Sequence, residues 1–214
     1  VFSFIDQNGR YAYGQQPDMA LWNLGRLAEA LLPGIDADTD QAVSLATDTL
    51  SRFDSIFGQA YLSGWRRKLG LFTEGRTDTT LISRLLTMMH RDEADFTLTF
   101  RHLNILARTD DARSFLAQFK DREAATSWLQ SWTGRLDTED QTADARFALM
   151  QASNPRIIPR NHRIEAAIKA ALTGDYTLFY QLTAALARPF EDANDGLDLP
   201  PASNEHVRNT FCGT

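Results

Sequence analysis

Apolar residues at helical spacing are the feature that most limits the fold of this 214-residue chain. Along most of its length Leu, Phe, Ala and Met recur every three or four residues, so they fall on one face of a helix. The first such stripe begins at Pro17 and contains Leu21, Leu24, Leu27, Ala28 and Leu31 before Pro33-Gly34. A longer one, from about residue 38 to residue 62, contains Val43, Ala46, Leu50, Phe53, Phe57 and Tyr61. The pattern predicts a mainly α fold with roughly eight to ten helices.

Acidic and hydroxyl residues mark where the later helices begin. Thr77 or Asp78 can cap a helix that carries Leu81, Leu85, Met88 and Met89. Further starts are expected at Asp110-Asp111, at Asp121 and at the acidic group Asp137, Glu139, Asp140 and Asp144. The last helical pair is expected at 160–172 and 175–187, joined by Gly174 at a position that favours positive φ.

The two ends of the chain have a different character. In residues 1–13, aromatic residues alternate with other residues on either side of the turn signal Asp6-Gln7-Asn8-Gly9. This pattern predicts a short N-terminal β-hairpin. After Arg188-Pro189 the sequence becomes polar and rich in Asp, Asn, Gly and Pro, which is typical of an irregular tail. We therefore expect a hairpin and lead-in over residues 1–16, a helical domain over 17–189 and a C-terminal tail over 190–214.

Charge and cysteine content exclude several classes of function. The formal net charge is -6 and the pI is about 5.2, so bulk charge does not favour a nucleic-acid or anionic-membrane partner. The sequence shows neither an apolar run long enough to span a bilayer nor a signal peptide. Its single cysteine, Cys212, rules out an internal disulfide and favours a reducing, intracellular compartment.

Motifs for catalysis and metal binding are missing from the sequence. It has no G-x-x-x-x-G-K-[ST], G-x-G-x-x-G, H-E-x-x-H, G-x-S-x-G or C-x-x-C. His90, His102, His162 and His206 are scattered without a second ligand at a suitable spacing, so surface or hydrogen-bonded histidines are the favoured interpretation. The sequence alone therefore predicts no catalytic, cofactor-binding or metal-binding residue in this chain.

Three clusters have both a functional and a structural interpretation. Trp65-Arg66-Arg67-Lys68 can meet a phosphate or an acidic partner, but a solvated helix end is favoured. Arg160-Asn161-His162-Arg163 lacks the Asp of a catalytic loop, so a helix start with Asn161 as cap and arginines pairing with acids is favoured. Trp128 and Trp132 fit an apolar core stripe better than a ligand cage.

Several stretches together resemble one family, selenoprotein O, the protein adenylyltransferases with a kinase-like fold. Each stretch alone is weak evidence, but together they occur in the same order along nearly the whole chain. They are Gly9-Arg10-Tyr11-Ala12-Tyr13, Gln16-Pro17, Trp22-Asn23-Leu24, Arg26-Leu27-Ala28, Lys68-Leu69-Gly70-Leu71, Thr99-Phe100-Arg101, Asn154-Pro155, Arg160-Asn161-His162, Gly174-Asp175-Tyr176, Pro200-Pro201 and Cys212-Gly213-Thr214. The resemblance implies that the helices form part of the C-terminal lobe of a kinase-like fold.

The resemblance also implies an activity, the transfer of AMP from ATP to Ser, Thr or Tyr hydroxyls of proteins with Mg²⁺ or Mn²⁺. In the family the lysine–glutamate pair, the catalytic Asp-Asn pair and the metal-binding Asp-Tyr-Gly lie in an N-terminal half, and none of these motifs occurs here. We therefore expect a segment that begins just after Asp-Tyr-Gly and, without a phosphate cradle, is inactive and binds no ATP or metal alone. Its expected partners are the missing half and protein substrates.

Cys212 is third from the C-terminus, where several family members carry selenocysteine. The resemblance implies a redox switch in which Cys212 pairs with a cysteine outside this chain. A flexible tail would expose the thiol and let it approach that partner. A free thiol without a role is the alternative. The expected location is the bacterial cytoplasm, or the mitochondrion if the source is eukaryotic. A stand-alone α-helical protein-interaction module without catalysis is the alternative function.

Overall fold

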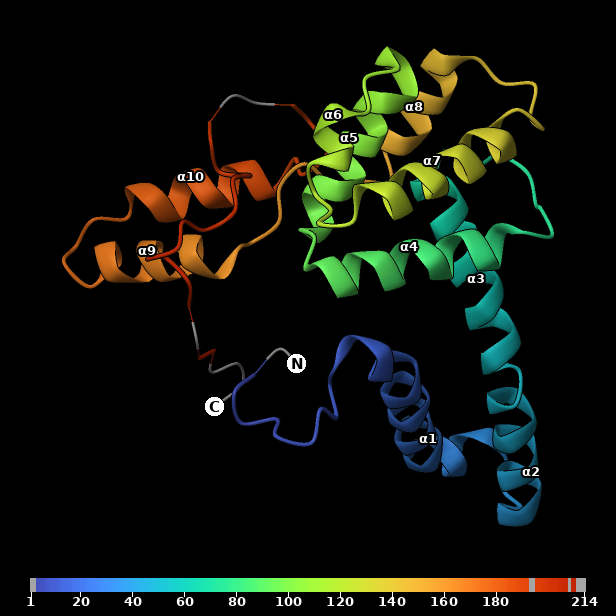
Figure 1. Ribbon diagram of the computed structural model, residues 1–214. Helices are drawn as coiled ribbons and strands as arrows, with labels where there is room; N and C mark the ends of the chain where they lie inside the picture. The colour runs from blue at the N-terminus through green and yellow to red at the C-terminus, as the bar shows by residue number, and fades with distance from the viewer. Residues whose placement is uncertain (1–2, 193–194, 208, 211–214) are drawn as a thin grey trace. The chain divides into compact units, whose positions relative to one another are not determined.

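The computed structural model of the chain describes residues 3–192, 195–207 and 209–210. Ten α-helices and one short 3-10 helix lie within these residues, which contain no strand (Figure 1). The prediction of a mainly α protein is confirmed. The elements are η1 (Tyr13–Gln15), α1 (Gln16–Ile35), α2 (Thr39–Leu50), α3 (Phe53–Lys68), α4 (Asp78–Asp92), α5 (Phe96–Thr109), α6 (Arg113–Leu116), α7 (Arg122–Leu136), α8 (Ala143–Gln151), α9 (Asn161–Ala171) and α10 (Thr177–Leu186).

The N-terminal β-hairpin predicted for residues 1–13 is not found in the residues described from residue 3 onward, which form turns. The Asp6 carboxylate accepts the backbone N–H groups of Arg10 (2.9 Å) and Tyr11 (2.8 Å). Gly9 has a φ of 66°, which a glycine adopts without strain. Since one side chain holds two backbone donors of the second half, successive turns replace the expected strand ladder.

The chain divides into two compact units. The first contains residues 1–61 and 207–214, and the second contains residues 62–206. In the first unit α1 packs against α2, and Ala42 on α2 is completely buried. Phe53, Phe57 and Tyr61 stack one turn apart along α3, with ring centroids 5.7 and 5.8 Å apart.

The long apolar stripe at 38–62 forms two helices rather than one. Asp38 caps α2 by accepting the N–H groups of Asp40 (2.9 Å) and Gln41 (3.3 Å), as an acidic residue at a helix start does. Near the other end of α2, Thr49 Oγ1 donates to Leu45 O and Ser51 Oγ donates to Asp48 O. These hydroxyls compete with the backbone for its acceptors, which periodicity does not reveal.

The core of the second unit is built on two stacked tryptophans from α7. The rings of Trp128 and Trp132 lie 6.2 Å apart, and Phe115 stacks on Trp128 at 5.7 Å. Their indole N–H groups donate to the carbonyls of Leu81 and Leu69, each over 2.9 Å. The predicted core role of both tryptophans is confirmed. The helices α4, α5, α6 and α8 lie together with α7 (Figure 1).

A helical hairpin made of α9 and α10 completes the second unit (Figure 1). Gly174 joins the two helices with a φ of 87°, as predicted. Arg156 and Ile157 donate their backbone N–H groups to Pro189 O, so the segments before and after the hairpin lie together. No helix within the described residues is both long and apolar enough to cross a membrane.

Candidate functional site

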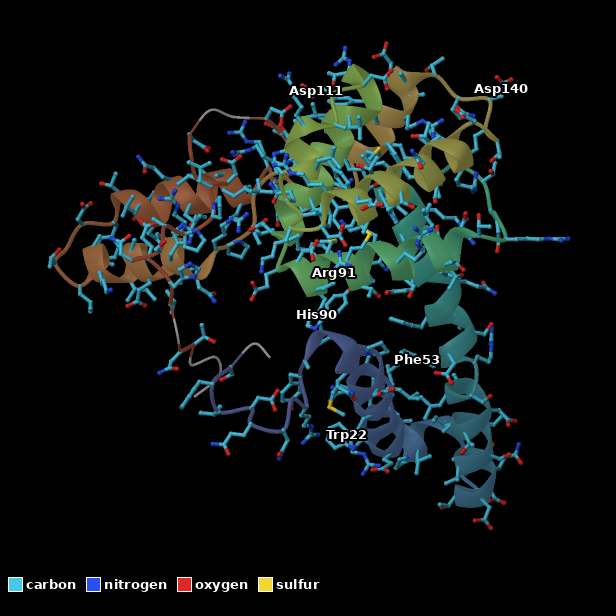
Figure 2. The ribbon with its side chains drawn as sticks, viewed as in Figure 1. Trp22, Phe53, His90, Arg91, Asp111 and Asp140 are labelled. Atoms are coloured by element: carbon cyan, nitrogen blue, oxygen red, sulfur yellow. The ribbon has the colours of Figure 1, made fainter. Side chains whose placement is uncertain are left out.

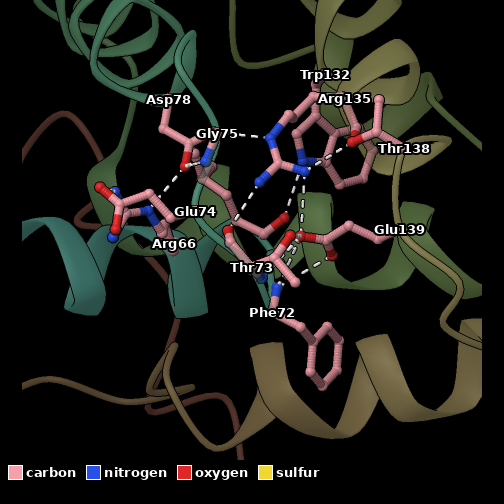
Figure 3. A network of polar contacts seen from close by, with 12 residues as sticks. Arg66, Phe72, Thr73, Glu74, Gly75, Asp78, Trp132, Arg135, Thr138 and Glu139 are labelled. Carbon is pink, nitrogen blue, oxygen red and sulfur yellow. Dashed lines mark hydrogen bonds and ion pairs between the residues drawn. The ribbon is translucent and has the colours of Figure 1, made fainter.

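A buried network of charged side chains joins α3, α4 and α7 to the loop after Gly70 (Figure 3). Arg135 lies at its centre, with a side chain that is only 7% exposed. Its guanidinium donates to Asp78 Oδ1 (2.8 Å), Thr73 O (2.8 Å), Thr138 Oγ1 (2.9 Å) and Glu139 Oε1 (3.1 Å). The arrangement gives one buried cation two buried carboxylates and two neutral acceptors.

The two carboxylates of this network are held by further donors. Asp78 accepts from Arg66 Nε (2.7 Å) and from Gly75 N–H (2.8 Å), and Arg66 also pairs with Glu74. Glu139 accepts from the backbone N–H groups of Phe72 and Thr73 and from the Thr73 hydroxyl. A carboxylate with this many donors is stabilised in its charged form.

The pKa values agree with a structural network. Burial alone raises the pKa of Asp78, but hydrogen bonds from Arg135, Arg66 and Gly75 outweigh it and lower the pKa below the ordinary value. The pKa of Glu139 is lowered in the same way, against burial, by Phe72 and Thr73. Neither acid is therefore suited to carry a proton at neutral pH, as a general acid must. The network ties a loop to three helices.

Two expectations from the sequence are wrong here. Arg66 and Lys68 were expected at a solvated helix end, but the Arg66 side chain is 14% exposed and pairs with Asp78, while Lys68 is half-buried. Glu139 was expected at a helix start, whereas α8 begins at Ala143 and only Asp144 lies in its first turn. No local signal in the sequence identified the contacts of Lys68 with Asn154 or of Glu139 with Phe72 and Thr73, because these partners lie far along the chain.

Lys68 forms a second set of polar contacts, with the segment that follows α8. Its Nζ donates to Asn154 Oδ1 (3.0 Å) and Ser153 O (3.2 Å), and lies 5.0 Å from the Phe100 ring centroid. Burial lowers the pKa of Lys68 to about 8. Gly70 follows with a φ of 72°, in a space closed by Arg146. The sequence stretches 68–71 and 154–155 are thus in direct contact.

Within the second unit, arginines hold the part of the chain that follows α10. Arg156, with a side chain 4% exposed, donates to both carboxylate oxygens of Asp195 (3.0 and 3.2 Å). Arg160 donates to both oxygens of Asp95 (2.6 and 3.0 Å) and to Asp198 O (3.0 Å). The predicted pairing of arginines with acids is confirmed, but Arg160 rather than Asn161 is the N-cap of α9.

The histidines do not form a site in the part of the chain that the structure describes. His162 is buried and His102 half-buried, and burial lowers the pKa of each. His90 and His206 are exposed. Among the described residues, no three His, Cys, Asp or Glu side chains lie together in a way that could hold a metal ion.

Cys212, the one regulatory residue predicted from the sequence, lies outside the described residues. The nearest described residue in sequence is Thr210. Its carbonyl accepts the backbone N–H of Phe4 over 2.7 Å and the Ser3 hydroxyl over 3.4 Å, all within the first unit.

Comparison with known proteins decides the family. The family model described as protein adenylyltransferase SelO matches residues 1–187. The chain belongs to this family. The protein nucleotidyltransferase YdiU of Bradyrhizobium diazoefficiens is 49% identical over 220 residues, and that of Rhizobium etli is 47% identical over 218 residues. Each comparison covers 100% of this chain but 44% of the relative, so the chain spans less than half the length of these relatives.

Proposed function

We propose that this chain supplies a helical scaffold to a longer protein adenylyltransferase. The longer protein transfers AMP from ATP to Ser, Thr or Tyr hydroxyls of other proteins, using Mg²⁺ or Mn²⁺. Membership of the SelO family supports the reaction class. The scaffold role is carried by one observation, the network around Arg135, in which the buried acids are bonded to protein donors and hold a loop between helices.

The chemistry of AMP transfer explains why the scaffold needs a further part. Charge develops on the transferring phosphorus and on the leaving pyrophosphate, so the site needs several cations and an acid-bound metal. The buried acids Asp78 and Glu139 are already neutralised by Arg66 and Arg135. We therefore propose that ATP and the metal bind residues outside these 214 and that the chain alone is inactive.

We also propose that Cys212 regulates the longer protein by forming a disulfide with a cysteine outside this chain. Hydrogen peroxide is a suitable oxidant: two S–H bonds and the O–O bond break, the S–S bond forms, and the two electrons and two protons released by the thiols leave with the oxygens as two waters. The Cys212→Ser variant of the longer protein should then show the same AMP transfer in oxidising and in reducing buffer. If the wild-type protein also shows no difference, the redox role is wrong.

A stand-alone protein-interaction module is the second candidate. The observation in its favour is that α10 carries no charged residue, while Phe179 and Tyr180 are 50% and 67% exposed. Such side chains commonly contact another protein. This candidate requires no ATP-dependent chemistry from any longer form of the protein.

One experiment separates the two candidates. The longer protein is incubated with ATP, Mg²⁺ and a bacterial protein extract, and modified peptides are identified by mass spectrometry. We expect AMP on Ser, Thr or Tyr side chains, and no modification when residues 1–214 replace the longer protein. Absence of AMP from every peptide, with a folded longer protein that binds partners from the extract, would favour the interaction module.

A further inference from the structure

An exposed arginine stacked on aromatic rings forms a second polar feature, which lies in the first unit. The Arg10 guanidinium carbon lies 4.7 Å from the centroid of the Trp22 ring and 5.5 Å from that of Tyr11. Its Nε donates to the Met19 sulfur over 3.1 Å. Figure 2 shows Trp22 on α1. The rings and the sulfur hold the guanidinium in one place, so little entropy is lost when it binds a ligand.

The backbone that carries Arg10 is held as well. The Asp6 carboxylate accepts the N–H groups of Arg10 and Tyr11, and Gly9 closes the turn. Asp6 therefore directs its oxygens to the backbone rather than to the guanidinium. The turn presents Arg10 and Tyr11 together on the side of Trp22.

Arg10 lacks a carboxylate partner within the described residues, unlike Arg135, Arg156 and Arg160 of the second unit. Neither of its Nη atoms has a hydrogen bond within the described residues, and the side chain is exposed. Arg26 also lies over Trp22, at 5.6 Å, but it pairs with Glu29 over 2.6 Å. A planar guanidinium with free Nη donors matches the two oxygens of a carboxylate.

Apolar surface surrounds this cation. Trp22 is 47% exposed and Tyr11 48%, which leaves aromatic area open beside the guanidinium. Aromatic and arginine side chains are the residues that contribute most binding energy at protein interfaces. The surface fits a ligand that combines one anionic group with an apolar side chain.

Charge decides which anion the surface fits. Residues 1–61 contain three arginines, no lysine and eight carboxylates, so this part of the chain repels a strongly anionic ligand. A triphosphate needs several cations, and Arg26 is already paired. A single carboxylate next to an apolar group meets one free guanidinium and open aromatic rings, without a second anion to be repelled.

We propose that Arg10 and Trp22 form a docking surface for an extended protein segment that carries one Asp or Glu beside an apolar side chain. The proposal rests on the proposed function in that the segment belongs to a protein substrate of AMP transfer. The Arg10 guanidinium binds the carboxylate through its Nη atoms, while Trp22 and Tyr11 contact the apolar neighbour. The surface binds the substrate at a distance from the acceptor hydroxyl and takes no part in the chemistry.

The test follows the Trp22 indole N–H by NMR in the whole 214-residue chain, with its signal assigned through Trp22→Phe. The probes are a peptide with one Glu between Phe and Leu and the same peptide with Gln, each added to roughly 1 mM. We expect the Glu peptide to shift the Trp22 signal and the Gln peptide to bind about tenfold more weakly. The Trp128 indole, which is bonded to Leu81 O, is the internal reference.

The variant Arg10→Gln should remove the difference between the two peptides, and Arg52→Gln should preserve it. Arg52 is the matched control because it is an exposed arginine of the same unit. Equal binding of both peptides by the wild-type chain, or no shift of the Trp22 signal with either, overturns the proposal. A shift with ATP but not with the Glu peptide also overturns it. None of these measurements requires AMP transfer, so a failure here is distinct from a failure of the proposed function.

Discussion

Lys68 and Asn154 bind each other in both directions: Lys68 Nζ donates to Asn154 Oδ1 over 3.0 Å, and Asn154 Nδ2 donates to Lys68 O over 2.9 Å. The two residues are 86 positions apart in the sequence. The contact joins the end of α3 to the segment after α8, and it keeps an ammonium group in a half-buried place against Phe100. The acceptors are amide and carbonyl oxygens rather than carboxylates, so burial lowers the pKa of Lys68 to about 8.

This pKa predicts an unusual dependence of stability on pH. Between about 8 and the ordinary value of 10.5 the unfolded chain binds more protons at Lys68 than the folded chain, so the free energy of unfolding rises with pH. With allowance for solvent screening, we expect a gain of about 1 to 2 kcal/mol between pH 7.5 and 9.5. Urea unfolding followed by tryptophan fluorescence measures it.

The control for Lys68 is Lys68→Met, which removes the titrating group and keeps an unbranched apolar stem. Its overall stability changes through the lost hydrogen bonds, but its free energy of unfolding should be flat over the same pH range. A slope as steep as that of the wild-type chain would show that another group titrates. The range stops at pH 9.5 because tyrosines begin to ionise above it.

The network around Arg135 predicts a large cost for removing one buried charge. Asp78→Asn leaves Arg66 and Arg135 facing a neutral amide, and we expect the free energy of unfolding to fall by about 3 kcal/mol. Asp111→Asn is the matched control, because Asp111 pairs with the exposed Arg113 on the surface. That variant should unfold with the wild-type midpoint in the same urea titration. Equal midpoints for all three proteins would contradict the structural role of the network.

A side chain at Gly75 should have a steric effect on the same network around Arg135. A Cβ atom there would lie 2.4 Å from Arg135 Nε and 2.7 Å from Asp78 Oδ1, so Gly75→Ala must push this ion pair apart. We expect a loss of about 2 kcal/mol or more. Gly134→Ala, in α7 with no atom within 4 Å of the added Cβ, should instead gain about 0.5 to 1 kcal/mol. Thermal unfolding of both variants shows whether their midpoints move in opposite directions.

The ion pair between Arg156 and Asp195 predicts local protection of the segment after α10. Leu197 N–H is bonded to the same Asp195 carboxylate over 3.1 Å. In Arg156→Gln we expect roughly tenfold faster hydrogen exchange at Leu197, because the carboxylate loses its anchor. Amides of α7 should keep their wild-type rates, and equal acceleration in both places would indicate general loss of stability instead. Arg188→Gln, which removes an exposed pair with Glu191, is the control.

The sequence predicted helices well because their signals are local. Asp121 caps α7 at the predicted helix start, and Gly174 adopts the predicted positive φ. Periodicity also placed Trp128 and Trp132 in the core. These predictions depend on residues within one or two turns, which the linear sequence displays.

The sequence did not predict the contacts that give the charged residues their roles. Arg135 reaches Asp78 across 57 positions, and the pattern around either residue does not indicate the other. Glu139 suited a helix start by composition, but it instead accepts the N–H groups of Phe72 and Thr73. The N-terminal alternation predicted a hairpin, but it does not reveal that the Asp6 carboxylate accepts backbone N–H groups and so favours turns. In each case a tertiary or side-chain contact outweighs a local preference.

The most direct test of the scaffold proposal is a titration of the 214-residue chain with ATP and Mg²⁺, followed by isothermal calorimetry and by the shift of the unfolding midpoint. We expect neither heat of binding nor a midpoint shift from the chain, and both from the longer protein under the same conditions. Micromolar binding of ATP by the chain alone would contradict the account, because it would require a phosphate site among these residues.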